Sequence, residues 1–111
     1  MNKRYKIVWT KSASSDLETI IRYIAKNNPE TAKTLFLKIR QEIAALSHSP
    51  KIGRYIPELQ EQGILLYREL IINPWRLIYK IGDKSVYIMA VIDSRRNVED
   101  ILFEKLIRMK I

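Results

Sequence analysis

The spacing of hydrophobic residues changes along the chain, and each change predicts a new kind of element. Between residues 5 and 10 apolar and polar residues alternate, which is typical of a short strand with Tyr5, Ile7 and Trp9 on one side. Further on, apolar residues recur every three or four positions, which is the period of an amphipathic helix. Two such helical stripes follow one another, namely Leu17, Ile20, Ile21 and Ile24, and then Ala32, Leu35, Phe36, Ile39, Ile43 and Leu46.

Polar residues and a proline mark the ends of these two helices. Residues 15–18 have the spacing of a capping box, although a start near Ser12 is an alternative. Asn28 is expected to cap the second helix, with Pro29 in its first turn. Two helices joined this tightly are expected to form an antiparallel hairpin.

The second half of the chain predicts an antiparallel sheet. Prolines and glycines break every period between residues 47 and 63, so this segment is interpreted as a surface loop. Residues 67–72, 75–81 and 85–92 then alternate as strands, with a tight turn at 82–84. In the middle strand Trp75, Leu77, Tyr79 and Ile81 share one side. Arg76, Ile78 and Lys80 share the other. That second side is expected to be open and is the candidate functional surface.

The last segment predicts a helix and completes the fold class. Asn97 is a candidate cap, and one face of the helix carries Val98, Ile101, Leu102, Leu106 and Met109. The order is strand, helical hairpin, three-stranded meander and C-terminal helix, which is an α+β arrangement with the hairpin on one sheet face. The length of 111 residues fits a single domain spanning positions 1–111.

Composition narrows the chemistry. Twenty Lys and Arg residues against twelve Asp and Glu give a net charge of +8, which favours an anionic partner, either nucleic acid or an acidic protein. The sequence contains no Cys and one His, so thiolate and histidine-rich metal sites are excluded, and no metal or cofactor is expected. No apolar segment resembles a signal peptide or a membrane span, so a cytoplasmic protein with no membrane partner is expected.

Arginines lie at the strands of the predicted sheet. Arg68 begins one strand, Arg76 lies inside the next, and Arg95 follows the third, so the sheet is expected to bring them together. Clustered guanidinium groups suit a phosphate or carboxylate partner. The alternative for Arg76 is a structural ion pair with Glu69.

The succession of short motifs resembles the RelE/ParE toxin superfamily. The motifs are Trp9-Thr10, Asp16-Leu17, Tyr23-Ile24-Ala25, Gly53-Arg54, Pro57-Glu58-Leu59, Tyr67-Arg68-Glu69, Trp75-Arg76-Leu77-Ile78-Tyr79 and Val91-Ile92-Asp93-Ser94-Arg95-Arg96. The resemblance implies the toxin of a bacterial type II toxin-antitoxin module and a compact α+β fold. It also implies one of two activities: RelE-like members cleave mRNA on the ribosome without metal, and ParE-like members poison DNA gyrase.

The C-terminal segment favours the ParE-like activity. RelE-like nucleases place a tyrosine, or a histidine and a tyrosine, near the last helix, where this chain has Ile101. Many relatives have histidine at the position of Asp93, and no His or Tyr follows Tyr87. Residues 93–106 resemble the ParE-like ending more closely. Gyrase poisoning is therefore the first hypothesis, and ribosome-dependent mRNA cleavage is the alternative.

The resemblance also implies site residues and partners. In a RelE-like nuclease the catalytic cations would be Arg76, Arg95 and Arg68. For either target, the residues expected to bind it are Arg68, Arg76, Arg95, Arg96 and Lys80. A cognate acidic antitoxin, encoded alongside, is expected to mask the toxin and to bring it to operator DNA. Val98, Ile101 and Leu102 are expected to contact that antitoxin, unless this stripe only covers the protein's own core.

Overall fold

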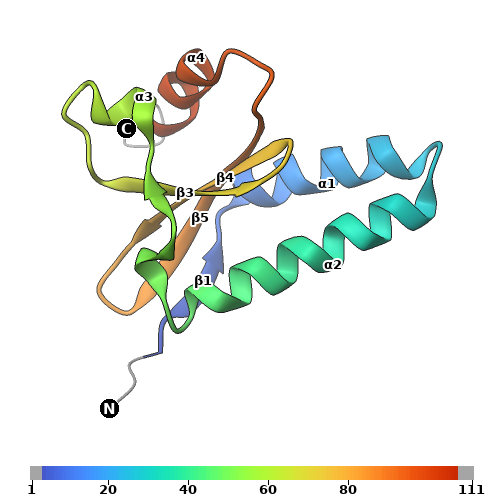
Figure 1. The fold of residues 1–111 in the computed structure, drawn as a ribbon, viewed down its shortest axis with the longest axis horizontal. Coiled ribbons are helices and arrows are strands. Elements are labelled where there is room, and N and C mark those ends of the chain that lie inside the picture. The colour runs from blue at the N-terminus through green and yellow to red at the C-terminus, as the bar shows by residue number, and fades with distance from the viewer. Residues whose placement is uncertain (1–3, 108–111) are drawn as a thin grey trace.

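A five-stranded sheet forms the centre of the structure, and helices lie on both of its faces (Figure 1). The computed structural model describes residues 4–107. The predicted α+β class and element order are confirmed. The strands are β1 (Lys6–Trp9), β2 (Arg54–Tyr55), β3 (Tyr67–Ile72), β4 (Trp75–Ile81) and β5 (Ser85–Asp93). The helices are α1 (Lys11–Ala25), α2 (Pro29–Leu46), α3 (Pro57–Gln60) and α4 (Val98–Leu102), with a 3₁₀ turn η1 (Pro50–Ile52) and a π-helical turn η2 (Phe103–Ile107).

The sheet contains the predicted meander and two further strands. Its order is β1-β5-β4-β3-β2, with β4 in the middle. Strands β3, β4 and β5 are antiparallel neighbours, as predicted, whereas β1 pairs with β5 in parallel. The short strand β2 pairs with β3 and lies within the segment 47–63. The prediction of an irregular loop there is wrong in part, because η1, β2 and α3 also form in it.

Capping side chains set the helix ends. Asn28 caps α2 and Asn97 caps α4, as predicted. Helix α1 begins earlier than the capping box suggests, because the Thr10 hydroxyl oxygen accepts the Ala13 N–H at 3.2 Å. The same hydroxyl donates to the carbonyl oxygen of Ile88 at 2.7 Å and so fixes the start of α1 on β5.

Each face of the sheet carries its own hydrophobic core. On one face the α1–α2 hairpin packs on the sheet, as predicted, and buries Ala13, Ile39, Ile43, Leu46, Leu70, Leu77, Tyr79 and Ile88. On the other face α3, α4 and η2 bury Ile56, Leu59, Ile78, Ala90, Val98, Leu102 and Leu106. The expectation of an open second face is therefore wrong, because the 57–60 helix and the last helix both cover it. Met109 lies outside the described residues.

None of the helices within residues 4–107 is long and apolar enough to cross a membrane.

Candidate functional site

Arg76 belongs to a buried ion network with Glu58, Glu69 and Arg54. Arg76 lies on the middle strand, and its side chain points to the α3–α4 face of the sheet, where it is 8% exposed. Its Nε donates to Glu69 Oε1 at 2.6 Å, and its two terminal nitrogens donate to Glu58 at 2.8 and 2.7 Å. The other oxygen of Glu69 accepts from Arg54 Nε at 2.7 Å. The structural alternative for Arg76, an ion pair with Glu69, is therefore present.

The network shifts the pKa values of Arg76 and Glu58 so that both groups stay ionised. Hydrogen bonds to Glu58, and after them those to Glu69, raise the pKa of Arg76. The hydrogen bonds from Arg76 likewise lower the pKa of Glu58. Because the Arg76 guanidinium forms a two-pronged pair with Glu58 and a further pair with Glu69, a phosphate would have to displace a carboxylate to bind it.

Arg68 lies on the opposite face of the sheet from Arg76. It shares its face with Leu70 and stacks on the Tyr55 ring at 4.3 Å from the centroid. Its Nη1 donates to the carbonyl oxygen of Gly53 at 2.7 Å. The expectation that the strand arginines gather in one place is wrong for Arg68 and Arg76. Successive side chains along a strand point to opposite faces of the sheet, and the pairing of β3 with β4 places these two arginines on different faces.

The segment before β2 is anchored to the sheet by a buried tyrosine. The Tyr79 hydroxyl accepts the N–H of Gly53 at 2.9 Å and donates to the carbonyl oxygen of Pro50 at 2.7 Å. A β-carbon on Gly53 would lie 2.6 Å from the Glu69 carbonyl oxygen, so only glycine fits this approach. The Gly53-Arg54 motif therefore positions β2 and, with it, the outer partner of Glu69.

Arg95 and Arg96 are exposed at the end of β5, beside a hollow of about 540 Å³ between α1 and the sheet. Arg95 Nε and Nη2 donate to Asp93 at 2.9 and 2.7 Å, and these hydrogen bonds lower the pKa of Asp93 to about 2. The hollow, here called the Tyr23 hollow, is lined by Asp16, Thr19, Ile20, Tyr23, Trp75, Val91, Asp93, Arg95 and Arg96.

Asp16, on the wall of the Tyr23 hollow, joins three elements. Its carboxylate accepts the N–H of Val91 at 3.0 Å and pairs with Lys105 Nζ at 2.5 Å. Lys105 also donates to the Ser12 hydroxyl at 2.8 Å. Asp16 therefore ties α1 to β5 and to η2.

The remaining predicted site residues lie on the α3–α4 face. Lys80 is half-buried, with its ammonium 5.7 Å from the centroid of the Tyr87 ring. Val98 and Leu102 are buried in the second core, and Ile101 packs against it. This stripe therefore covers the protein's own core, as the alternative held, and its two buried side chains are closed to an antitoxin in this conformation.

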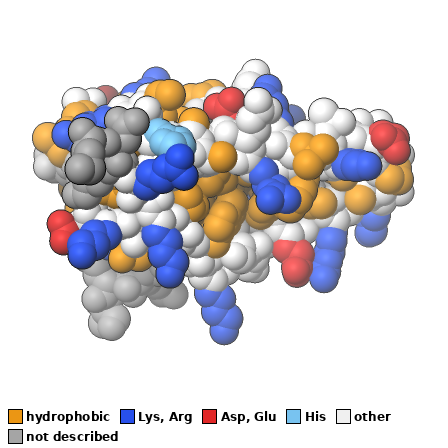
Figure 2. Space-filling model, turned by 90° about the horizontal axis from the view of Figure 1, so that it is seen from below, with side chains coloured by type: hydrophobic (Ala, Val, Ile, Leu, Met, Phe, Trp, Pro, Cys, Tyr) orange, Lys and Arg blue, Asp and Glu red, His pale blue; other side chains and the backbone are white. Residues whose placement is uncertain are grey.

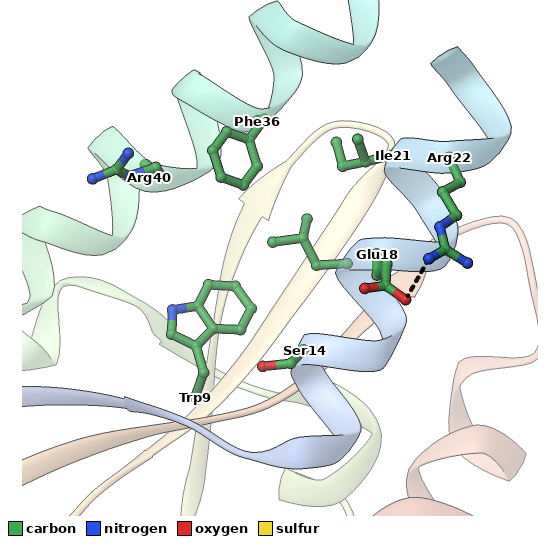
Figure 3. Close-up of a pocket in the computed structure, with 8 residues that line it drawn as sticks. Trp9, Ser14, Glu18, Ile21, Arg22, Phe36 and Arg40 are labelled. Carbon is green, nitrogen blue, oxygen red and sulfur yellow. Dashed lines mark ion pairs between the residues drawn. The ribbon is translucent and has the colours of Figure 1, made fainter. Parts of the chain in front are cut away.

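The sequence analysis missed an apolar groove between the two long helices. Trp9 at the end of β1 lies across from Phe36 and Arg40 of α2, and α1 closes the other side (Figure 3). The groove has a volume of about 460 Å³ and is lined by Trp9, Ser14, Leu17, Glu18, Ile21, Arg22, Phe36 and Arg40. Leu17 packs partly against the first core, as predicted, whereas Phe36 is 37% exposed in the groove.

Basic residues accompany this groove. The guanidinium of Arg40 lies 5.9 Å from the centroid of the Phe36 ring. Next to Phe36 on α2, Leu37 is 52% exposed. Seen from below, the molecule shows a band of hydrophobic side chains with Lys and Arg side chains on both sides (Figure 2). Such a surface is complementary to an amphipathic segment that carries acidic residues.

The described residues offer no metal centre. Within residues 4–107 no group of three or more His, Cys, Asp or Glu side chains is arranged to hold a metal ion.

Comparison with known proteins gives a family and a fold. The family described as the ParE toxin of the type II toxin-antitoxin system, parDE, matches residues 7–98. No curated protein matches the chain. A chain of the chromosomal ParDE system from P. aeruginosa is similar at 19% identity and a TM-score of 0.66, over 81% of this chain and 96% of that one. A chain of the RelBE2 toxin-antitoxin complex from Mycobacterium tuberculosis is similar at 19% identity and a TM-score of 0.55, over 82% of this chain and 92% of that one. The resemblance to the RelE/ParE superfamily is thereby confirmed.

Proposed function

We propose that this chain, which belongs to the ParE toxin family of type II toxin-antitoxin systems, arrests growth by poisoning DNA gyrase. The observation that carries the choice of target is the state of Arg76. A nuclease would use this arginine to stabilise the charge that develops on the scissile phosphate. Here the Arg76 guanidinium is buried and paired with Glu58 and Glu69, so it is already neutralised.

A lack of candidate general acids and bases near the last helix also supports a binding inhibitor over a nuclease. Cleavage by a ribose 2′-hydroxyl needs a general base and an acid for the leaving oxygen. From Ile88 to the end, the sequence contains neither His nor Tyr. Asp93 stands where many nucleases have histidine, and Arg95 holds it as a carboxylate with a pKa of about 2, which is too acidic to donate a proton near neutral pH.

The exposed arginines are the proposed contacts to the target. Arg95 has 73% of its side chain exposed, and Arg96 is exposed beside it. Arg68, Arg76 and Lys80 have their cationic groups stacked, paired or half-buried, so we place the target contacts at Arg95 and Arg96 first.

The proposed partner that masks the toxin is an acidic antitoxin. The chains that resemble this one belong to toxin-antitoxin complexes, which supports a cognate antitoxin. The net charge of +8 and Arg40 at the groove favour an acidic partner. In the groove between α1 and α2, Trp9 and Phe36 provide an apolar surface. We therefore place an antitoxin segment in this groove in preference to the last helix.

The test is a gyrase cleavage assay. Purified protein is mixed with gyrase, supercoiled plasmid and ATP, treated with protease and scored for linear plasmid, with a quinolone as positive control. Linear plasmid is expected to accumulate with dose. Arg95→Gln and Arg96→Gln are expected to lower its yield, whereas Lys33→Gln, an exposed cation on α2, is the charge-matched control and is expected to leave it unchanged.

Supercoiled plasmid that stays intact beside an active quinolone control would refute gyrase poisoning. The same protein added to translating ribosomes would then be assayed for cuts in mRNA by primer extension. Cuts that Arg95→Gln abolishes would establish the nuclease in its place.

A further inference from the structure

We infer that the Tyr23 hollow binds an unpaired nucleotide of single-stranded nucleic acid. The base would stack on Tyr23 and Trp75, and the phosphate would contact Arg96. This inference rests on the proposed function and makes it more specific, because the hollow would contact the DNA directly in the complex with gyrase.

Aromatic surface is the first reason. Tyr23 lies in the last turns of α1 and is 76% exposed, and it is not part of the apolar stripe of that helix. Trp75 lines the same hollow from the first position of β4. Stacking of a base on an aromatic side chain is sequence-tolerant because every base has a flat π-face.

The charge balance of the hollow is the second reason. Both acidic side chains on its wall have partners: Asp93 pairs with Arg95, and Asp16 pairs with Lys105 and accepts the Val91 N–H. Neither carboxylate is left as an isolated charge that would repel a phosphate.

Donors remain available for a phosphate. Arg95 uses Nε and Nη2 for Asp93, and Arg96 makes no side-chain ion pair within the described residues. Arginine suits phosphate because its fork of N–H groups matches the phosphate oxygens. The cation and the aromatic surface therefore lie together in one hollow.

The shape of the hollow favours an unpaired nucleotide over a duplex. Its volume of about 540 Å³ lies in the range of small-molecule sites, and its aromatic wall is useful only to a base whose face is free. In a duplex the base faces are stacked on one another, so a duplex would use the arginines alone.

The test measures binding of a fluorescein-labelled mixed-sequence DNA strand of about ten nucleotides by anisotropy, beside the same sequence as a duplex. Tyr23→Ala is expected to weaken single-strand binding about tenfold and to leave duplex binding unchanged. Tyr23→Phe keeps the ring and is the matched control, with binding expected to stay within about twofold of wild type. Arg96→Gln is expected to lower the slope of log K against log salt by about 0.7, and Lys33→Gln to leave that slope unchanged.

Two results would overturn the inference. The first is a Tyr23→Ala variant that binds the single strand like wild type, or that loses affinity for single strand and duplex equally. Either outcome would mean that binding is only nonspecific attraction between charges. Displacement of the strand by an equal charge of poly-glutamate peptide, with the same dependence on Tyr23, would indicate a protein partner instead.

The oligonucleotide assay contains no gyrase, so the two proposals fail separately. Single-strand binding that depends on Tyr23, without linear plasmid in the cleavage assay, refutes gyrase poisoning alone. Linear plasmid that Tyr23→Ala leaves unchanged overturns the assignment of the hollow to gyrase-bound DNA.

Discussion

Replacement of Arg76 by methionine should cost the fold a large part of its stability. Methionine keeps the length of the side chain but removes the cation that faces two carboxylates. Glu58 has 31% of its side chain exposed and can be rehydrated, whereas Glu69 has none exposed. After the change, Glu69 would keep only Arg54, whose side chain is 58% exposed and whose charge is largely screened by water.

The expected loss follows from the burial of Glu69. Removing one partner of a buried ion pair costs about 3 to 5 kcal/mol, because an uncompensated charge is left inside. Small proteins are stable by only about 5 to 15 kcal/mol, so the loss should be visible in any unfolding experiment. The double variant Arg76→Met with Glu69→Met removes both buried charges, so its loss should be smaller by about 2 kcal/mol.

The assay is urea unfolding followed by the fluorescence of Trp9 and Trp75. With a slope of about 1.5 kcal/mol per molar urea, a loss of about 3 kcal/mol lowers the midpoint by about 2 M. The matched control Lys33→Gln should change the free energy of unfolding by less than about 0.5 kcal/mol. An Arg76→Met midpoint equal to wild type would refute the structural role, as would a double variant less stable than the single one.

Two further predictions concern the same anchoring region. Because Arg76 lowers the pKa of Glu58 below its ordinary value of 4.5, the stability that this carboxylate contributes is present above that value and is lost as the pH falls through the lower, folded pKa. Urea unfolding from about pH 7 to about pH 3 should therefore show a smaller decline for Glu58→Gln than for wild type, and equal declines would contradict this linkage. Gly53→Ala would place a methyl group 2.6 Å from the Glu69 carbonyl oxygen, so β2 must move, and we expect a loss of about 1 to 3 kcal/mol by thermal unfolding. An unchanged melting temperature would show that β2 adapts without cost.

Local pattern predicted the elements well because it reports on burial. The strands at 67–72 and 75–81 are observed with the predicted limits. The caps Asn28 and Asn97 were recognised because they act on backbone groups only a few residues away. The role of Asp16 in joining α1 to β5 and η2 was not predicted, because its partners Val91 and Lys105 lie far along the chain.

Most of the geometry of the candidate sites could not be predicted from local pattern. Tyr23 is the exception, because a large aromatic residue outside the apolar stripe of its helix predicts an exposed ring, and Tyr23 is 76% exposed. The groove between α1 and α2 carried none, because Phe36 has the same spacing as a core residue. The arginines were found as residues, but their separation onto two faces follows from strand pairing.

The α+β class, the order of the elements, the excess of positive charge and the lack of cysteine chemistry could all be predicted from the sequence. They follow from composition or from the pattern of neighbours a few positions apart, and both are present before the chain folds. Only the tertiary structure decided that Arg76 is closed in by Glu58 and Glu69, and that Tyr23, Trp75 and Arg96 line one hollow. Those relations join residues from different elements, so they exist only once strand register and helix packing are fixed.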